Sequence, residues 1–196
     1  MTNRAHNTRL KEKDFKFICE YVYDVAGIVL GESKKEMVYR RLTRIIRDRK
    51  LSSFSEYCQL LRSEPEKEKD YFINAITTNL TSFYREEHHF DYLKNYEFPS
   101  LLQKNIASKR IRIWSSASST GEEPYSLGIT AYRSFASVLR NWDIKILATD
   151  IDSNVLAQGK KGIYDKRRIE DLPEDIKAKY FKKGSGGNCD KVKITN

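Results

Sequence analysis

Apolar residues in the first 80 positions recur at intervals of three and four, the spacing that places them on one face of an α-helix. The first stripe contains Phe15, Ile18, Val22 and Val25, and Gly27 follows it where a helix would end. Three more stripes each follow residues typical of a helix start. They are Val38, Leu42 and Ile45 after a capping box of Ser33 and Glu36; Tyr57, Leu60 and Leu61 after a second capping box of Ser53 and Glu56; and Phe72 and Ile76 after Ser63, Pro65 and Glu66. The pattern predicts a small all-α helical domain over residues 1–80.

The period changes in residues 81–196. Short strand-like runs at Arg110–Ile113 and Ile144–Thr149 flank a helical pattern from about Glu122 to Leu139. Strand, helix and strand in this order predict an α/β domain with a parallel sheet and a right-handed crossover. The remaining predicted elements are a helix from Ser153, a helix over Pro173–Phe181, a turn at Gly184–Gly187 and a strand from Lys191 to Thr195.

The extent of this second domain is unusual. A doubly wound sheet needs roughly 150 residues or more, and the residues from Ile111 to Asn196 are fewer than that. Either the domain is very small or the chain stops inside a larger fold. In the second case we expect an incomplete sheet with an uncovered edge and apolar face, through which the chain would self-associate.

Charge and cysteine content narrow the class of protein. The formal net charge is +9, which indicates an acidic partner; general solubility is the alternative explanation. Cys19, Cys58 and Cys189 are odd in number and widely spaced, so they suggest a reducing, cytoplasmic location rather than disulfides or a metal site. No apolar run is long enough to predict membrane insertion, and the polar residues 1–16 contain no signal core.

The most informative segment is the loop Trp114–Ser126, which follows the first predicted strand and opens a helix. In a βαβ unit, a small ligand binds at this turn. Thr120 and Glu123 form a possible capping box, and one glycine alone excludes the G-x-G-x-x-G phosphate loop. Two glutamates and many small residues favour a zwitterionic or cationic nucleoside-type cofactor. A simple capped helix start is the alternative.

Acidic residues also end the second predicted strand. Asp150 lies at the strand tip, where a carboxylate typically accepts hydrogen bonds from ribose hydroxyls. Asp152 and Ser153 follow at once, and either residue could instead cap the next helix.

A third polar group lies between the two predicted domains, in Thr77–Phe90. Asn79, Thr81 and Arg85 stand among apolar residues, and an arginine there could bind a carboxylate through two parallel hydrogen bonds. An ordinary helix start is the alternative. His88 and His89 are adjacent and should point to different faces, so we interpret them as packing or solvated residues and expect no metal site.

One helix of the first domain carries a basic face. Arg40, Arg44 and Arg47 fall on the same side, away from Leu42, Ile45 and Ile46. This face is either a solvated surface of a basic protein or a docking surface for an acidic partner.

Together these segments resemble the CheR family of chemotaxis receptor methyltransferases, which use S-adenosylmethionine. The resemblance extends in order along the chain and rests on three separate motifs. They read Thr78-Asn-x-Thr-x-Phe-Tyr-Arg-Glu-x-x-His-Phe90; then Ile113-Trp-Ser-x-Ala-x-Ser-Thr-Gly-Glu-Glu-Pro-Tyr-Ser126; then Ala148-Thr-Asp-Ile-Asp152 with Gly162-Ile-Tyr164.

The resemblance implies a receptor-docking helical domain and a Rossmann-like methyltransferase domain with a small antiparallel β-subdomain, which would begin near Gly184. It also implies that S-adenosylmethionine methylates receptor glutamates, giving methyl esters and S-adenosylhomocysteine. Asp150 would hold the ribose and Arg85 would lie near the transferred methyl group. The implied cofactor residues are Asn79, Thr81, Arg85, Glu123 and Asp150; the implied docking residues are Arg40, Arg44 and Arg47.

One family feature is missing: an Asn-Val-x-Ile-Tyr-Phe strand that completes the cofactor site does not occur in the sequence. The sequence therefore resembles a C-terminally truncated member, and a non-catalytic module that binds a receptor or signalling protein is the second hypothesis. A nucleic-acid methyltransferase is the third. It is disfavoured, and no nucleic-acid partner is expected, because the Asp/Asn-Pro-Pro-Tyr/Phe motif is absent and the basic helix lacks an aromatic stacking surface.

Overall fold

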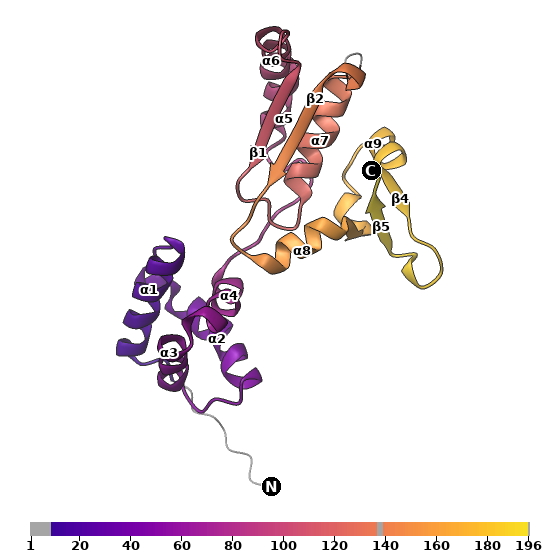
Figure 1. Ribbon diagram of the computed structural model, residues 1–196. Coiled ribbons are helices and arrows are strands. Elements are labelled where there is room, and N and C mark those ends of the chain that lie inside the picture. The colour runs from indigo at the N-terminus through magenta and orange to yellow at the C-terminus, as the bar shows by residue number, and fades with distance from the viewer. Residues whose placement is uncertain (1–8, 137–138, 196) are drawn as a thin grey trace. The chain divides into compact units, whose positions relative to one another are not determined.

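The computed structural model describes residues 9–136 and 139–195. The chain divides into two compact units, Met1–Thr78 and Asn79–Asn196, so the division falls just before the predicted boundary at residue 80 (Figure 1). Within the described ranges, no helix has both the length and the apolar character needed to cross a membrane.

The described part of the first unit is entirely helical, as predicted. Its elements are α1 (Glu12–Ala26), the 3-10 helix η1 (Glu32–Lys34), α2 (Lys35–Asp48), α3 (Phe54–Ser63) and α4 (Pro65–Ile76). Gly27 ends α1 because it adopts the left-handed conformation, with φ 66°, and its N–H bonds to the carbonyl of Tyr23 over 2.8 Å. The predicted helical periodicity therefore continues to the residue before this glycine.

The core of the first unit is built from the predicted apolar stripes. Its fully or almost fully buried members are Phe15, Ile18, Val22, Val38, Leu42, Ile46, Phe54, Tyr57, Leu61, Phe72, Ile73 and Ile76. Of the two adjacent isoleucines in α2, Ile46 is buried, whereas Ile45, which the stripe contained, is only half-buried. The helix faces that the periodicity selected thus supply most of this core.

Of the two predicted capping boxes in this unit, only one caps its helix as expected. The Ser53 hydroxyl accepts a hydrogen bond from the N–H of Glu56 over 3.2 Å. The Ser33 prediction is wrong: η1 precedes α2, and Lys34 occupies the cap position without a side-chain hydrogen bond. The 3-10 turn moves the helix start beyond the serine, so Ser33 cannot reach the first free N–H groups.

The second unit contains two sheets and several helices. Its helical elements are α5 (Glu87–Tyr92), the π-helix η2 (Leu93–Glu97), α6 (Phe98–Lys104), α7 (Glu122–Ser134), η3 (Leu139–Asn141), α8 (Ser153–Lys161), η4 (Lys166–Ile169), α9 (Glu174–Tyr180) and η5 (Gly186–Asn188). Its strands are β1 (Arg110–Ser115), β2 (Asp143–Ala148), β3 (Ile163–Asp165), β4 (Phe181–Lys183) and β5 (Lys191–Ile194). The sequence did not predict α5, η2 and α6, whose apolar residues follow no sustained period.

The predicted strand–helix–strand unit is present. Strands β1 and β2 pair in parallel, with Arg110 opposite Asp143 and Ser115 opposite Ala148, and α7 connects them and contacts β2 (Figure 1). The connecting helix ends at Ser134, before the predicted end at Leu139, and Phe135 directly after it is fully buried. One face of the sheet packs through Ile111 against Phe98 and Phe135.

The opposite face of this sheet is exposed in the described residues. Trp114 is 68% exposed and Leu147, its partner in register, is 59% exposed. Toward the amino ends of the strands the same face carries Arg112, which forms an ion pair with Asp143. The face that we expected to be apolar is therefore apolar only near the carboxyl ends of the strands.

A separate antiparallel sheet has the order β3–β5–β4. It begins at Ile163, which corrects the prediction that the β-subdomain starts near Gly184. Strand β3 is only three residues long and pairs with β5, about thirty positions later, so its local sequence gives no strand signal. Phe83, Tyr164 and Phe181 pack edge to face behind this sheet, with ring centroids 5.0 and 5.2 Å from that of Phe83.

Candidate functional site

The loop between β1 and α7 is fixed at the carboxyl ends of both parallel strands. The N–H of Ser118 bonds to the Thr149 carbonyl, and the N–H of Thr149 bonds to the Ser115 carbonyl, each over 2.9 Å. Ser118, Ser119 and Thr120 are buried although all three are polar. The small side chains thus allow the loop to fold tightly at the place where α/β sheets bind ligands.

Helix α7 begins differently from the prediction. Gly121 occupies the cap position with φ 97° and provides no side chain, so Thr120 is not the N-cap. The Thr120 hydroxyl instead donates to Oε2 of Glu122 over 2.6 Å. The predicted capping partner, Glu123, is exposed and accepts from the Ser115 hydroxyl over 2.7 Å, which attaches it to the end of β1.

Asp150 lies where the sequence placed it, just beyond the end of β2. Its Oδ2 accepts from the N–H of Ser119 over 2.7 Å, and its Oδ1 accepts from the N–H of Asp152 over 2.9 Å. The alternative role as a helix cap belongs to Asp152, whose Oδ1 accepts from the N–H groups of Asn154 and Val155 at the start of α8. The two aspartates therefore have different tasks.

The segment after Thr78 is not a capped helix start. Helix α5 begins only at Glu87, and the cap residue Glu86 makes no side-chain capping bond. Asn79 makes two contacts: its carbonyl accepts from the Ser119 hydroxyl in the β1–α7 loop over 3.1 Å, and its side-chain amide donates to Asp152, which follows β2, over 2.7 Å. These contacts attach the segment to the ends of both strands.

Arg85 is exposed on the same segment and donates to the Leu80 carbonyl over 2.9 Å, while Thr81 is half-buried. The residues on either side of Arg85 have left-handed backbones, with φ 52° at Tyr84 and φ 58° at Glu86. Ser119 in the facing loop has φ 49°. A left-handed backbone is strained for a non-glycine residue and persists only where the surrounding structure holds it. Such residues cluster at functional sites.

The structure thus joins Asn79, Glu123 and Asp150 through one loop, with Ser115 and Ser119 as the connecting residues. Among the described residues, no hydrogen bond or ion pair joins that loop to Arg85 or Thr81, which belong to the set through the segment that begins at Asn79. These side chains fit a nucleoside whose tail carries positive charge together with a carboxylate. Carboxylates suit ribose hydroxyls and ammonium groups, and a guanidinium suits a carboxylate.

Two models of known protein families match this chain. Residues 79–195 match the SAM-binding domain of CheR methyltransferases, and residues 13–77 match the all-alpha domain of the same proteins. The chain belongs to the CheR methyltransferase family. S-adenosylmethionine is accordingly the cofactor of its second unit, and the predicted α/β fold with an all-α first domain is confirmed.

Curated relatives of the CheR family match over most of the chain. Chemotaxis protein methyltransferase 2 of Pseudomonas aeruginosa is 42% identical over 190 residues, which is 96% of this chain and 64% of the relative. The chemotaxis protein methyltransferase of Escherichia coli is 38% identical over 186 residues, covering 94% of this chain and 62% of the relative. The chain therefore spans slightly less than two thirds of the length of these relatives.

The predicted docking residues of this CheR-family chain lie on an open helix surface. The side chains of Arg40, Arg44 and Arg47 are 77%, 80% and 75% exposed. Arg40 pairs with Glu36, and Arg44 and Arg47 both pair with Asp48, so cations outnumber anions on this face of α2.

The two histidines are the exception to the predicted arrangement near this segment. The rings of His88 and His89 lie with centroids 4.2 Å apart, so they do not point to different faces as expected. In the described part of the chain, no three His, Cys, Asp or Glu side chains are grouped so that they could hold a metal ion.

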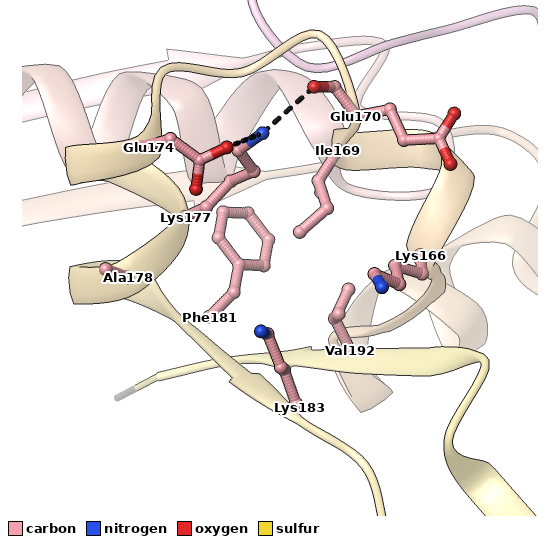
Figure 2. A pocket seen from close by; sticks show the side chains of 9 residues that line it. All are labelled: Lys166, Ile169, Glu170, Glu174, Lys177, Ala178, Phe181, Lys183 and Val192. Atoms are coloured by element: carbon pink, nitrogen blue, oxygen red, sulfur yellow. Dashed lines mark hydrogen bonds and ion pairs between the residues drawn. The ribbon is translucent and has the colours of Figure 1, made fainter.

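A cavity of about 550 Å³ lies in the antiparallel region, apart from the predicted cofactor residues. Figure 2 shows its apolar residues Ile169, Phe181 and Val192 between charged side chains of η4, α9 and β4. Lys177 is held at the rim by Glu174 over 2.7 Å and by the Glu170 carbonyl over 3.0 Å, whereas Lys166 and Lys183 complete the basic lining.

Sequence reasoning missed the side chains that hold the β1–α7 loop through hydrogen bonds and an ion pair. Glu122 is fully buried and forms an ion pair with Arg168 of η4, and the Tyr164 hydroxyl donates to the Thr120 carbonyl over 2.8 Å. Burial raises the pKa of the Tyr164 phenol. Glu122 lies within the recognised motif, but no local pattern links it to Arg168, 46 positions later.

Proposed function

We propose that this chain transfers a methyl group from S-adenosylmethionine to glutamate side chains of chemotaxis receptors. The observation that carries the proposal is the loop after β1, which joins Asn79, Glu123 and Asp150 in a domain whose family binds this cofactor. The names of the relatives, chemotaxis protein methyltransferases, support the receptor as substrate. The three free cysteines support a cytoplasmic location.

We assign a separate task to each residue. Asp150 accepts hydrogen bonds from the ribose hydroxyls, since each of its oxygens can accept a further hydrogen bond beside the one from a backbone N–H. Glu123 and Asn79 line the same side of the site. Arg85 binds the carboxylate of the methionine part, with Thr81 beside it, and so holds the reacting end near the transferred methyl group. Arg85 is the residue that we propose as catalytic.

The reaction requires alignment more than acid–base chemistry. The bound cofactor supplies a methyl group already activated by its sulfonium. One oxygen of the substrate carboxylate forms the new bond to the methyl carbon, and the electrons of the broken carbon–sulfur bond remain on sulfur. The products are a glutamyl methyl ester and S-adenosylhomocysteine. A carboxylate is ionised at neutral pH, so the protein needs to orient it and exclude water.

The receptor would be bound by the first unit. Arg40, Arg44 and Arg47 form an exposed cationic row on α2 that complements an acidic helix. The three lysines and the apolar floor of the cavity in Figure 2 support a second contact, with an acidic peptide segment of the receptor.

Methyl transfer can be tested with S-adenosylmethionine that carries a labelled methyl group and a purified receptor cytoplasmic fragment. We expect label in the receptor that is released as methanol in mild alkali, because methyl esters are hydrolysed there whereas methylated amines are not. Alkali-stable label, or none in the receptor while S-adenosylhomocysteine binds, would contradict glutamate methylation.

The alternative is a non-catalytic binding module. The exposed cationic row belongs entirely to the first unit, so docking does not depend on the chemistry of the second. Capture of the receptor fragment by the chain without any methyl transfer would favour this second function.

A further inference from the structure

Glu122 has a fully buried carboxylate that the proposed cofactor contacts do not use. A buried carboxylate is costly unless it is paired and hydrogen-bonded. Both requirements are met, because Arg168 forms an ion pair with Oε1 and the Thr120 hydroxyl donates to Oε2 over 2.6 Å. The partner arginine comes from η4, beyond the second strand and α8.

The residues around Glu122 are held from other directions as well. The Tyr164 hydroxyl, in a side chain only 2% exposed, donates to the Thr120 carbonyl over 2.8 Å. Gly121 packs so closely that an added Cβ would lie 2.9 Å from the Tyr164 oxygen and 3.0 Å from Cα of Gly159. Its φ of 97° also disfavours any other residue.

The element that supplies Arg168 is itself firmly anchored. Ile169, the next residue, is 5% exposed and belongs to the core that contains Phe83 and Phe181. Asp165 caps η4 by accepting from the N–H of Arg167 over 3.0 Å. The guanidinium of Arg168 is therefore presented to the loop from a fixed backbone.

The segment that these contacts hold is flanked by proposed cofactor residues. On one side, Ser119 has a left-handed backbone and donates its N–H to Asp150. On the other side, Glu123 begins the exposed face of α7. A shift of Thr120–Glu122 would therefore move Glu123 and the Ser119 N–H that bonds to Asp150, and so disturb two of the proposed cofactor contacts.

We propose that the Glu122–Arg168 ion pair and the Tyr164 hydroxyl form a clamp that fixes this loop in its cofactor-binding shape. Arg168 and Tyr164 are then positioning residues for S-adenosylmethionine, although neither touches it. This inference rests on the proposed function, because it assumes that the loop receives the cofactor.

The test compares Arg168→Met, Arg168→Lys and Tyr164→Phe with Arg167→Met as matched control. Arg167 is the neighbouring arginine on η4, but its side chain is 81% exposed and forms its ion pair with Asp165, not with the loop. Because Arg168→Met leaves a buried carboxylate unpaired and could prevent folding, the double variant Glu122→Gln/Arg168→Met removes both charges. Two quantities are measured: S-adenosylhomocysteine affinity by calorimetry, and hydrogen exchange of the loop amides without ligand.

We expect the dissociation constant to rise about tenfold in Arg168→Met, the double variant and Tyr164→Phe, since each removes a hydrogen bond that orders the loop. Loop amides should exchange faster in the same variants, Arg168→Lys should recover part of the affinity, and Arg167→Met should match the wild type. Lowered thermal stability with unchanged affinity and unchanged loop exchange would overturn the clamp.

The proposed function can fail separately. If the wild-type chain itself did not bind S-adenosylhomocysteine, the cofactor role of the clamp would be overturned together with the proposed site. Normal wild-type affinity with equal affinity in all the folded variants would overturn the clamp alone.

Discussion

The side-chain amide of Asn79 donates a hydrogen bond to Oδ2 of Asp152 over 2.7 Å, while Oδ1 of the same carboxylate caps α8. The first residue of the second unit is thereby attached to the end of the parallel sheet. Asn79 thus supports the site structurally, in addition to the cofactor contact that we propose for it.

Replacing Asn79 with alanine should therefore reduce both stability and cofactor binding. A hydrogen bond to a charged group contributes about 1.5–3 kcal/mol, so we expect the free energy of unfolding to fall by roughly that amount. Urea denaturation measures the loss, and calorimetry with S-adenosylhomocysteine measures binding. Asn95→Ala, at an exposed position of η2, is the control and should change neither quantity. An Asn79→Ala protein with wild-type stability would contradict this role.

Removal of either Arg85 or Asp150 should impair function, but only the loss of Asp150 should also reduce stability. Arg85 is exposed and donates to the Leu80 carbonyl at the surface, so Arg85→Ala should alter the free energy of unfolding by about 0.5 kcal/mol or less. Methyl transfer should be abolished. Asp150→Ala removes two acceptors of backbone N–H groups and should reduce stability as well as binding. Asp171→Ala, at an exposed position, is the control; full activity of either variant would contradict the site assignment.

Charge reversal on α2 should weaken receptor binding and leave the fold intact. We expect Arg44→Glu to reduce affinity for an acidic receptor fragment, and the loss should be larger at low salt because exposed charges are screened at high salt. The matched control is Lys13→Glu, an exposed charge reversal on α1. Equal effects of the two variants in a pulldown or a binding titration would argue against a specific docking face.

The thiols of Cys58 and Cys189 should react with a thiol reagent at very different rates. Burial raises the pKa of Cys58 to about 12, whereas Cys189 is exposed. Because the thiolate is the reactive form, Cys58 should resist a thiol reagent at pH 8 until the chain is unfolded in urea. A Cys189→Ser variant should lose the fast phase. Fast modification of Cys58 in the folded protein would contradict its burial.

The same shift predicts the alkaline side of the stability profile. The folded-state pKa of Cys58 lies above the ordinary value, so its contribution to stability is complete below about pH 9 and is lost as pH rises toward 12. Burial also raises the pKa of Tyr57 and Tyr164, which acts in the same direction. Cys58→Ser should flatten the alkaline fall of the free energy of unfolding measured in urea.

The exposed carboxyl-end face of the parallel sheet should cause self-association. Trp114 and Leu147 lie side by side in register and are both more than half exposed, which makes an apolar patch. We expect sedimentation to show concentration-dependent dimers or larger species, reduced in Trp114→Ser/Leu147→Ser. Tyr92→Ser is the control, because Tyr92 is 58% exposed on a helix. A monomer at all concentrations would contradict the prediction.

Local patterns in the sequence predicted much of the first unit because its helices have apolar stripes and end signals that lie close together in sequence. The apolar stripe of α1 and the left-handed Gly27 after it are both local features, separated by a few residues. The same holds for β1, β2 and α8, whose order specifies a parallel pair. Ser33 failed as a cap because a single 3-10 turn shifted the helix start, and pattern reasoning does not resolve such shifts.

For the site, the sequence by itself determined the family and the cofactor, and it led us to propose Asp150 and Glu123 as cofactor residues. Only the tertiary structure decided that Gly121 rather than Thr120 is the N-cap of α7, that Asn79 bonds to Asp152, and that the antiparallel sheet begins at Ile163. It alone paired Glu122 with Arg168. The physical reason is distance along the chain: a motif records neighbours in sequence, whereas a buried charge is stabilised by whichever partner the fold brings to it.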